Sequence, residues 1–255
     1  MKREMNVREP LSGTVDVVGV PVEPFCEASI TDAVMEWVGR PGVDVAVGVN
    51  AHVCNLARRD ERLRDFLAAS ACYADGQSIV WSARLLGGRH EERLATTDIA
   101  EPLLAAAAEQ GIPVFFLGSD VGVAEEAARR LRARIPELRV KTQHGYFGAS
   151  ETIEVLDAIA DHETGILFVG FGDPAQQRWI AEHAEDLPPV VLTCGGLFDW
   201  LSGAQRRAPG WMIDAGLEWL WRLIREPRRL AGRYVIGNAK FLFALARQLA
   251  GRGRP

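Results

Sequence analysis

Four aspartates stand in or beside predicted strand ends and turns, which is where α/β proteins commonly bind their ligands. They are Asp75, Asp98, Asp173 and Asp199. Asp75 is followed by Gly76, so its carboxylate is sterically open enough to accept a proton from a substrate hydroxyl. A structural interpretation stays open for each, because aspartate also forms turns and caps helices; Asp98 can cap a helix over residues 99–108.

Three glycine-containing turns are predicted between strands and helices, and each offers backbone N–H groups to an anion. They contain Gly118, Gly170-Phe171-Gly172 and Gly195-Gly196. The positive end of the following helix dipole strengthens such a site, so the turns at Gly170, Gly172 and Gly195 suit a phosphate. The middle turn lacks the third glycine of the dinucleotide fingerprint G-x-G-x-x-G. A single turn of this kind is usually structural, whereas three at one rim favour a phosphate-bearing ligand.

The sequence offers no metal motif. No two aspartates are spaced D-x-D, the arrangement with which many sugar transferases hold a metal–nucleotide pair, and the histidines form no H-E-x-x-H pattern. We therefore predict no metal ion and no cofactor, so the charge of a departing diphosphate must be met by arginines and backbone amides. The four cysteines have no C-x-x-C spacing and are predicted to be reduced thiols.

The elements that must position these residues alternate regularly along the chain. Residues 14–24 predict a β-hairpin, and continuous apolar strands are predicted over residues 43–49, 71–74, 113–117, 138–146, 166–169 and 190–193. Helical spacing separates them, over residues 29–38, 55–69, 99–108 and 151–161, after the turn at 118–120, and from 174. Buried strands that alternate with helices indicate an α/β fold, a Rossmann-like parallel sheet with helices on both faces.

Charge is distributed unevenly. The chain has 255 residues and a net charge of −5, but residues 206–255 hold eleven basic and three acidic groups, and the preceding 205 residues hold 18 basic and 31 acidic groups. This gives +8 for the C-terminal segment against −13 for the body. We predict three parts: a disordered N-terminus over residues 1–13, a catalytic domain over 14–205 and a basic amphipathic appendage over 206–255.

The appendage mixes tryptophan and leucine with arginine, a composition that suits an anionic membrane surface. Arg222, Arg225 and Arg229 have the i, i+3, i+7 spacing of one helix face, and Pro227 is predicted to kink or restart that helix. A solvated helix or a dimer contact is the structural alternative. Nucleic acid is disfavoured as a partner because the body is acidic. No apolar run reaches about 20 residues and residues 1–13 lack a signal-peptide core, so we expect a cytoplasmic protein.

Three stretches carry a resemblance to a known family. Residues 168–180 (FVGFGDPAQQRWI) resemble G-x-G-x-P-K-Q-E-x-W-I, and residues 194–212 (CGGLFDWLSGAQRRAPGWM) resemble G-G-x-F-D-x-L-S-G-x-x-x-R-A-P-x-W, both motifs of the WecG/TagA/CpsF glycosyltransferases. Residues 216–241 (GLEWLWRLIREPRRLAGRYVIGNAKF) are similar to the closing signature of that family. VNAHVCNLARRDE, YADGQSIVW and ERLATTDIA follow its order and spacing, so the resemblance covers residues 14 to about 245.

The resemblance implies an inverting, metal-independent enzyme. Such an enzyme moves a hexose, N-acetylmannosamine or a related sugar, from a UDP-sugar donor to a polyprenyl-pyrophosphate-linked acceptor in the synthesis of teichoic acid or another cell-wall polysaccharide. It acts as a peripheral protein on the inner face of the cell membrane, and the family suggests a homo-oligomer.

The resemblance also assigns residues. By likeness Asp75 is the general base, Asn50 lies beside it in the site, and Arg93 and Gln176 belong to the donor pocket. Other candidates for substrate binding come from the predicted rim and from the appendage, if the appendage folds over the pocket: Asp98, Gly170, Gly172, Gly195, Asp199, Arg222, Arg229 and Arg233.

This sequence departs from the family pattern at four positions. Gly48 stands where a threonine is usual, Thr96 where a glycine is usual, and Ala175 and Gln177 replace the lysine and glutamate of P-K-Q-E. These changes point to a different donor sugar, a different acceptor or weakened activity. Two other functions remain open from the residues alone, a nucleotide-dependent oxidoreductase and a non-catalytic membrane adaptor; the missing third glycine argues against the first.

Overall fold

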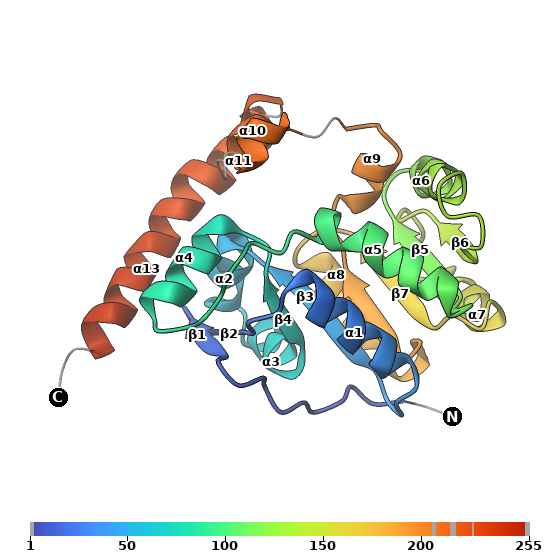
Figure 1. Cartoon of the computed structure of the whole chain (residues 1–255), viewed down its shortest axis with the longest axis horizontal. Helices are drawn as coiled ribbons and strands as arrows, with labels where there is room; N and C mark the ends of the chain where they lie inside the picture. The colour runs from blue at the N-terminus through green and yellow to red at the C-terminus, as the bar shows by residue number, and fades with distance from the viewer. Residues whose placement is uncertain (1–2, 206–207, 215–217, 226, 253–255) are drawn as a thin grey trace.

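A six-stranded parallel sheet forms the centre of the protein (Figure 1). The structure is a computed structural model that describes residues 3–205, 208–214, 218–225 and 227–252. The strand order is β4-β3-β8-β7-β5-β6. The strands are β3 (Asp44–Val49), β4 (Ala71–Ala74), β5 (Val114–Gly118), β6 (Val140–Gln143), β7 (Ile166–Gly170) and β8 (Val190–Thr193). The predicted α/β fold with a parallel sheet is therefore confirmed.

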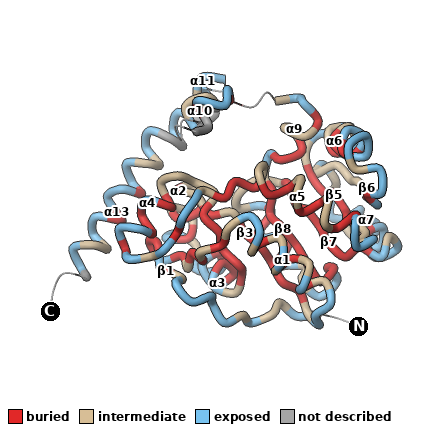
Figure 2. The backbone as a smooth tube through the Cα atoms, in the orientation of Figure 1, coloured by how far each residue is buried: buried red, intermediate tan, exposed pale blue. Residues whose placement is uncertain are grey.

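Helices cover both faces of the sheet because successive strand residues point to opposite sides and both sets are apolar. Phe116 and Phe168 pack on one face, and Leu117 and Val169 pack on the other. The first face is covered by α1 (Glu27–Val38), α5 (Thr96–Glu109), α6 (Val123–Arg132) and α9 (Leu197–Leu201). The second is covered by α2 (Ala51–Ala57), α3 (Glu61–Ala69), α4 (Gln77–Leu85), α7 (Thr152–Asp161) and α8 (Ala175–His183). Figure 2 shows the buried backbone running through the sheet.

The predicted hairpin is present as β1 (Val15–Val17) and β2 (Val20–Val22), which pair antiparallel. The two-residue loop has positive φ at Val18 (56°) and Gly19 (84°), the backbone that matches the twist of a tight hairpin. Both strands bury alternate valines in the core of the second face. The hairpin thereby closes that face beside α2 and α4.

Side-chain caps move several helix ends away from the predicted positions. The segment predicted as one helix over 55–69 is two helices, because Asn50 caps α2 through the backbone N–H groups of His52 and Val53 and Asp60 caps α3 through that of Leu63. α5 begins at Thr96, so Asp98 lies in its first turn instead of capping it. The division into α2 and α3 arises from side-chain caps that apolar periodicity does not report. The start of α5 has no such cap, because Ala95 precedes it.

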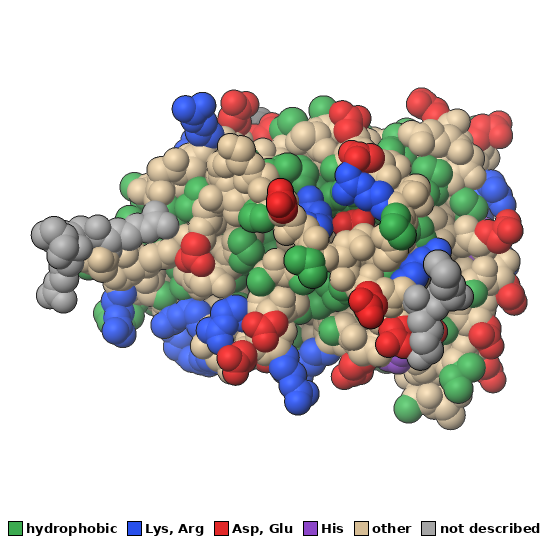
Figure 3. Space-filling view, turned by 90° about the horizontal axis from the view of Figure 1, so that it is seen from below, with side chains coloured by type: hydrophobic (Ala, Val, Ile, Leu, Met, Phe, Trp, Pro, Cys, Tyr) green, Lys and Arg blue, Asp and Glu red, His purple; other side chains and the backbone are tan. Residues whose placement is uncertain are grey.

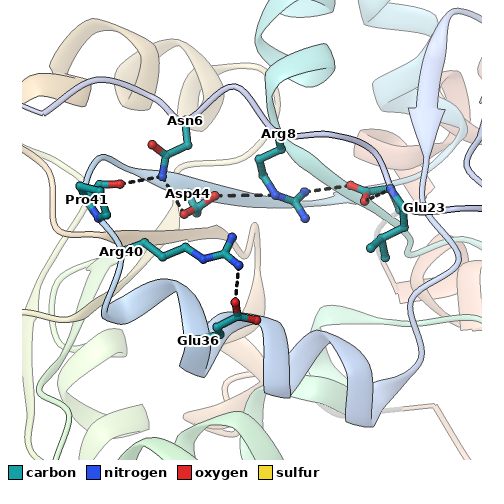
Figure 4. A network of polar contacts seen from close by, with 8 residues as sticks. Asn6, Arg8, Glu23, Glu36, Arg40, Pro41 and Asp44 are labelled. Carbon is teal, nitrogen blue, oxygen red and sulfur yellow. Dashed lines mark hydrogen bonds and ion pairs between the residues drawn. The ribbon is translucent and has the colours of Figure 1, made fainter.

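Residues 3–9 lie along the amino ends of the strands, in the segment where the sequence analysis expects disorder (Figure 4). The Asn6 amide donates to the Asp44 carboxylate at 2.8 Å, and Arg8 forms an ion pair with Glu23 at 3.0 Å. The Arg8 guanidinium also lies over the Trp37 ring, 4.6 Å from its centroid. Because Glu23 and Asp44 are buried, they need these partners to offset the cost of losing water.

The C-terminal segment is helical, as expected, and its last helix packs on the body. It contains α10 (Gly210–Asp214), α11 (Glu218–Arg225), α12 (Pro227–Ala231), a π-helical turn (Gly232–Ile236) and α13 (Gly237–Arg252). Phe241, Ala244 and Leu245 of α13 are buried in the core of the second face. Asn55 of α2 donates to the Gly237 carbonyl at 2.7 Å. Among the described residues, no helix combines the length and apolar composition needed to cross a bilayer.

Candidate active site

The carboxyl ends of four neighbouring strands bring the predicted site residues to one rim. Asn50 follows β3 and Asp75 follows β4, and these strands pair in parallel with Val49 opposite Ala74. Gly170 is the last residue of β7 and Gly195 lies in the turn after β8, and these are the next two strands of the sheet. After β3 the chain crosses to β4, on one side of β3. It enters β8, on the other side of β3, from β7. The boundary between β3 and β8 is therefore a topological switch point. Ligands of open α/β sheets bind at such points.

Asp75 and Asn50 are neighbours at this switch point. The Asp75 backbone N–H donates to the Val49 carbonyl at 3.0 Å, which fixes the residue at the end of β3. A Cβ atom on Gly76, the residue after Asp75, would lie 3.4 Å from the Asn50 Cβ. The side-chain oxygen of Asn50, Oδ1, caps α2 by accepting two backbone N–H groups. Its Nδ2 group is therefore the part of the side chain able to contact a ligand beside the Asp75 carboxylate.

Arg93 and Asp98 form an ion pair close to the same rim. Their N–O distance is 3.1 Å, and both side chains are partly exposed, Arg93 by 16% and Asp98 by 32%. The Leu94 N–H donates to the Ala74 carbonyl at 2.8 Å, so this segment is fastened to the residue that precedes Asp75. Asp98 orients the guanidinium, which stays accessible enough to meet a diphosphate.

Gln176 holds two of the glycine turns together. Its side-chain oxygen accepts the N–H groups of Gly172 at 3.2 Å and Gly195 at 3.1 Å, and its amide donates to Asp173 at 2.9 Å. The residue is only 4% exposed. The turns are also close to each other, since a Cβ on Gly170 would lie 2.8 Å from the Gly195 carbonyl oxygen. Two N–H groups that the sequence offers to a phosphate are thus already bonded within the chain.

Asp199 lies in the first turn of α9, beside the β8 turn. A Cβ on Gly196 would be 3.3 Å from an Asp199 carboxylate oxygen. The side chains of Arg222, Arg229 and Arg233 lie outside the described part of the structure, so their contact with a ligand stays a prediction.

Sequence analysis missed Tyr146 and Asp120, which lie at the other end of the rim. Tyr146 is 72% exposed, and its hydroxyl is hydrogen-bonded to Asp120. This bond and the negative charge of Asp120, with a smaller effect of Asp199, raise the pKa of Tyr146. Ser119, next to Asp120, has a φ of 59°, which is unusual outside glycine and common at functional sites. An exposed ring beside two carboxylates suits a ligand with a flat face and hydroxyl groups.

A hollow lies between α5, α6 and α9, one residue along α5 from Thr96. Trp200 and Leu201 supply its apolar wall. Arg129, Arg130 and Arg134 supply cations, which are ion-paired with Glu126 and Glu101. Within the described ranges no three acidic, histidine or cysteine side chains are grouped to hold a metal ion. Metal independence itself stays a prediction.

The fold and this rim define an α/β protein with a candidate ligand site at the switch point of a parallel sheet. The sequence model of the glycosyl transferase WecG/TagA/CpsF family matches residues 15–255, and the chain belongs to that family. It is therefore a glycosyltransferase. Among characterised relatives it is similar to the N-acetylglucosaminyldiphosphoundecaprenol N-acetyl-beta-D-mannosaminyltransferase of Bacillus subtilis (strain 168). The two are 28% identical over 213 residues, which cover 81% of this chain and 82% of the relative.

Proposed function

We propose that the protein is an inverting, metal-independent transferase that moves a hexose from a UDP-sugar to a polyprenyl-pyrophosphate-linked sugar in cell-wall or exopolysaccharide synthesis. The hexose is of the N-acetylmannosamine type or a related one. Family membership and the name of the Bacillus subtilis relative support the reaction class. The observation that carries the proposal is the placement of Asp75 at the switch point, beside Asn50 and close to the Arg93–Asp98 pair.

Asp75 acts as the general base. A sugar hydroxyl is a weak nucleophile, so a carboxylate within hydrogen-bond reach must take its proton as the new C–O bond forms. The hydroxyl oxygen attacks the anomeric carbon, the bond from that carbon to the β-phosphate oxygen breaks, and UDP leaves with the electron pair. Attack from the side opposite UDP inverts the anomeric centre. The proton ends on Asp75.

Cations stabilise the negative charge that develops on the departing UDP. Arg93 is held by Asp98 at the rim and is the described candidate. Arg222, Arg229 and Arg233 of the appendage are proposed to add to it. Such groups accelerate the reaction because they bind the charge in the transition state more strongly than in the ground state.

The surface formed by α2, α4 and α13 is proposed to face the inner leaflet of the cell membrane. Arg58, Arg59 and Lys240 line a hollow between α2 and α13, with Phe243 at its edge. Trp81 on α4 and Phe243 on α13 are 58% and 66% exposed. In Figure 3, lysine and arginine side chains also gather at the end of the molecule that carries α13. Cations that surround exposed aromatic rings suit an anionic lipid surface. A homo-oligomer would compete for the same surface.

Binding of UDP separates this proposal from the alternatives. UDP at about 100 times its Kd is expected to stabilise the folded protein by about 2.7 kcal/mol, whereas NAD is expected to have no effect. A shift of the melting temperature with NAD and none with UDP would favour the oxidoreductase. No shift with either nucleotide, together with binding to anionic vesicles, would favour the membrane adaptor.

The catalytic test is Asp75→Asn. The variant is expected to lose about 10²- to 10⁴-fold in kcat while its affinity for UDP changes little, because the amide cannot accept the proton. Asp161→Asn is the control, since Asp161 is exposed at the end of α7 and away from the rim. Turnover is measured as UDP released from a screen of UDP-sugars with a short-chain lipid-pyrophosphate sugar as acceptor. Unchanged turnover in Asp75→Asn would remove it as the base.

A further inference from the structure

Two departures from the family motifs that are far apart in the sequence meet beside Asp75. Gly48 lies in β3 opposite Tyr73 of β4, and Thr96 begins α5. A Cβ atom on Gly48 would lie 3.1 Å from the Thr96 hydroxyl oxygen. The same atom would lie 3.0 Å from the Asp75 Cβ and 3.2 Å from one Asp75 carboxylate oxygen. The space that a side chain at position 48 would fill is therefore shared by the Thr96 hydroxyl and the Asp75 carboxylate.

The Thr96 hydroxyl is held in place by a buried partner. It lies 2.7 Å from the hydroxyl of Tyr73, which is fully buried, and Thr96 itself is 7% exposed. Burial raises the pKa of the Tyr73 phenol, and the nearby Asp75 carboxylate raises it further, so the phenol keeps its proton. When Tyr73 donates this proton to Thr96, the hydrogen of the Thr96 hydroxyl is left to point toward the space beside Asp75.

Helix capping and packing do not require this hydroxyl. The cap residue of α5 is Ala95, and it makes no side-chain cap bond. Valine has the same shape as threonine, and phenylalanine the same ring as tyrosine. A Phe–Val pair would therefore fill this space without two buried hydroxyls that must satisfy each other. A buried polar pair that borders the same small space as the Asp75 carboxylate points to a role in the reaction.

We propose that Gly48 and Thr96 act as one unit, in which the absent side chain at position 48 makes room for the Thr96 hydroxyl to position the Asp75 carboxylate. Thr96 is a positioning residue that acts through Asp75. Thr96 supplies from α5 a hydroxyl that, in the family motif, a threonine at position 48 of the strand supplies. The inference rests on the proposed function, since it assigns a helper to its general base.

The first test removes the hydroxyl and keeps its volume. Thr96→Val is expected to lower kcat by roughly 10- to 100-fold through loss of carboxylate positioning, with UDP affinity unchanged. Thr96→Ser is expected to retain most of the turnover because it keeps the hydroxyl. Thr164→Val is the matched control: Thr164 is also 7% exposed, but its hydroxyl donates to the Ile159 carbonyl at 2.7 Å. Thr164 precedes the start of β7 and so lies at the amino ends of the strands, away from the rim. This variant is expected to lose stability without losing turnover.

The second test is a double-mutant cycle. Gly48→Thr alone is expected to lower both kcat and the melting temperature, because its side chain would collide with Thr96 and Asp75. Thr96→Gly alone removes the hydroxyl and is also expected to lower kcat. The double variant Gly48→Thr, Thr96→Gly returns a hydroxyl to the same space from the strand. It relieves the contact with Thr96 but keeps the tight contact with Asp75, so it is expected to be more active than Gly48→Thr and to show strong non-additivity.

The outcomes distinguish this inference from the proposed function. Wild-type kcat in Thr96→Val, or a double variant no more active than Gly48→Thr, would overturn the Gly48–Thr96 unit while Asp75→Asn stays inactive. A wild-type protein that releases UDP from no UDP-sugar would overturn the proposed function, and this inference with it. Recovery in the double variant together with a selective loss in Thr96→Val supports the inference.

Discussion

Replacing Gln176 by leucine tests whether this residue shapes the rim or touches the donor. The side chain makes three hydrogen bonds, to the N–H groups of Gly172 and Gly195 and to the Asp173 carboxylate. Leucine has a similar size and makes none of them. Gly172 and Gly195 are only half-buried, so water can replace part of what their N–H groups lose.

The magnitude follows from these contacts. At about 1 kcal/mol for each hydrogen bond, Gln176→Leu is expected to destabilise the fold by about 3 kcal/mol. In a domain of this size such a loss lowers the melting temperature by about 6–12 °C. The two glycine turns are then no longer fixed to each other, so the affinity for UDP is expected to fall as well.

Gln177→Leu is a matched control at the next position. Gln177 is also buried, but it makes a single hydrogen bond, 2.7 Å to Asp173, and its side-chain oxygen has no partner among the described residues. The same substitution there is expected to cost about 1 kcal/mol or less, because it also removes an unsatisfied buried oxygen.

Thermal unfolding with and without UDP decides between the two roles of Gln176. A role in holding the turns lowers the melting temperature of the protein without ligand. If Gln176→Leu unfolds at the wild-type temperature without UDP and loses only the stabilisation by UDP, the side chain binds the donor directly and our reasoning about the turns is wrong.

Two further predictions concern the C-terminal helix and the thiols. Phe241→Ala is expected to destabilise the fold by about 3–5 kcal/mol, whereas Phe243→Ala, at an exposed position, is expected to change stability by less than about 0.5 kcal/mol and to weaken sedimentation with anionic vesicles. Equal melting temperatures for the two variants would contradict the docking of α13. Near pH 8, Cys26 is expected to react first with a thiol reagent, because hydrogen bonds from Ser29 lower its pKa while burial raises the pKa of the other three cysteines, Cys54, Cys72 and Cys194. More than one fast equivalent would contradict this assignment.

Patterns that extend over a whole element could be predicted from the sequence. Residues 190–193, three apolar residues and a threonine, form β8 with the predicted bounds, because a short apolar run between turns is stable as a strand in a sheet covered on both faces. The placement of Asn50 beside Asp75 also follows from such reasoning, since parallel strands end at a common rim.

Contacts between distant turns could not be predicted in this way. The bond from Gly195 to Gln176 exists because β7 and β8 are neighbours, and the sequence gives no sign that one carboxamide serves both turns. β6 ends at Gln143 instead of Tyr146 because the Gly145 N–H donates to the Ser119 carbonyl, which draws the chain out of the sheet.

The appendage shows a limit of another kind. Phe241 and Phe243 have the same side chain, and composition indicates an amphipathic helix without saying which face meets the body. The structure buries the first and exposes the second, because α13 is fixed by bonds at Gly237 and Gln248. Phe241, Ala244 and Leu245 have the i, i+3, i+4 spacing of one helix face, but this spacing alone does not tell that the face packs on the body.

The place of β3 in the sheet also has a consequence during synthesis. One neighbour, β4, emerges from the ribosome soon after β3, but the other, β8, begins only at Val190. Until then one edge of β3 carries unpaired backbone groups and a row of valines, which is a template for wrong pairing. The nascent chain is therefore expected to need chaperones that cover this edge, and a chain truncated before residue 190 is expected to aggregate or to be degraded.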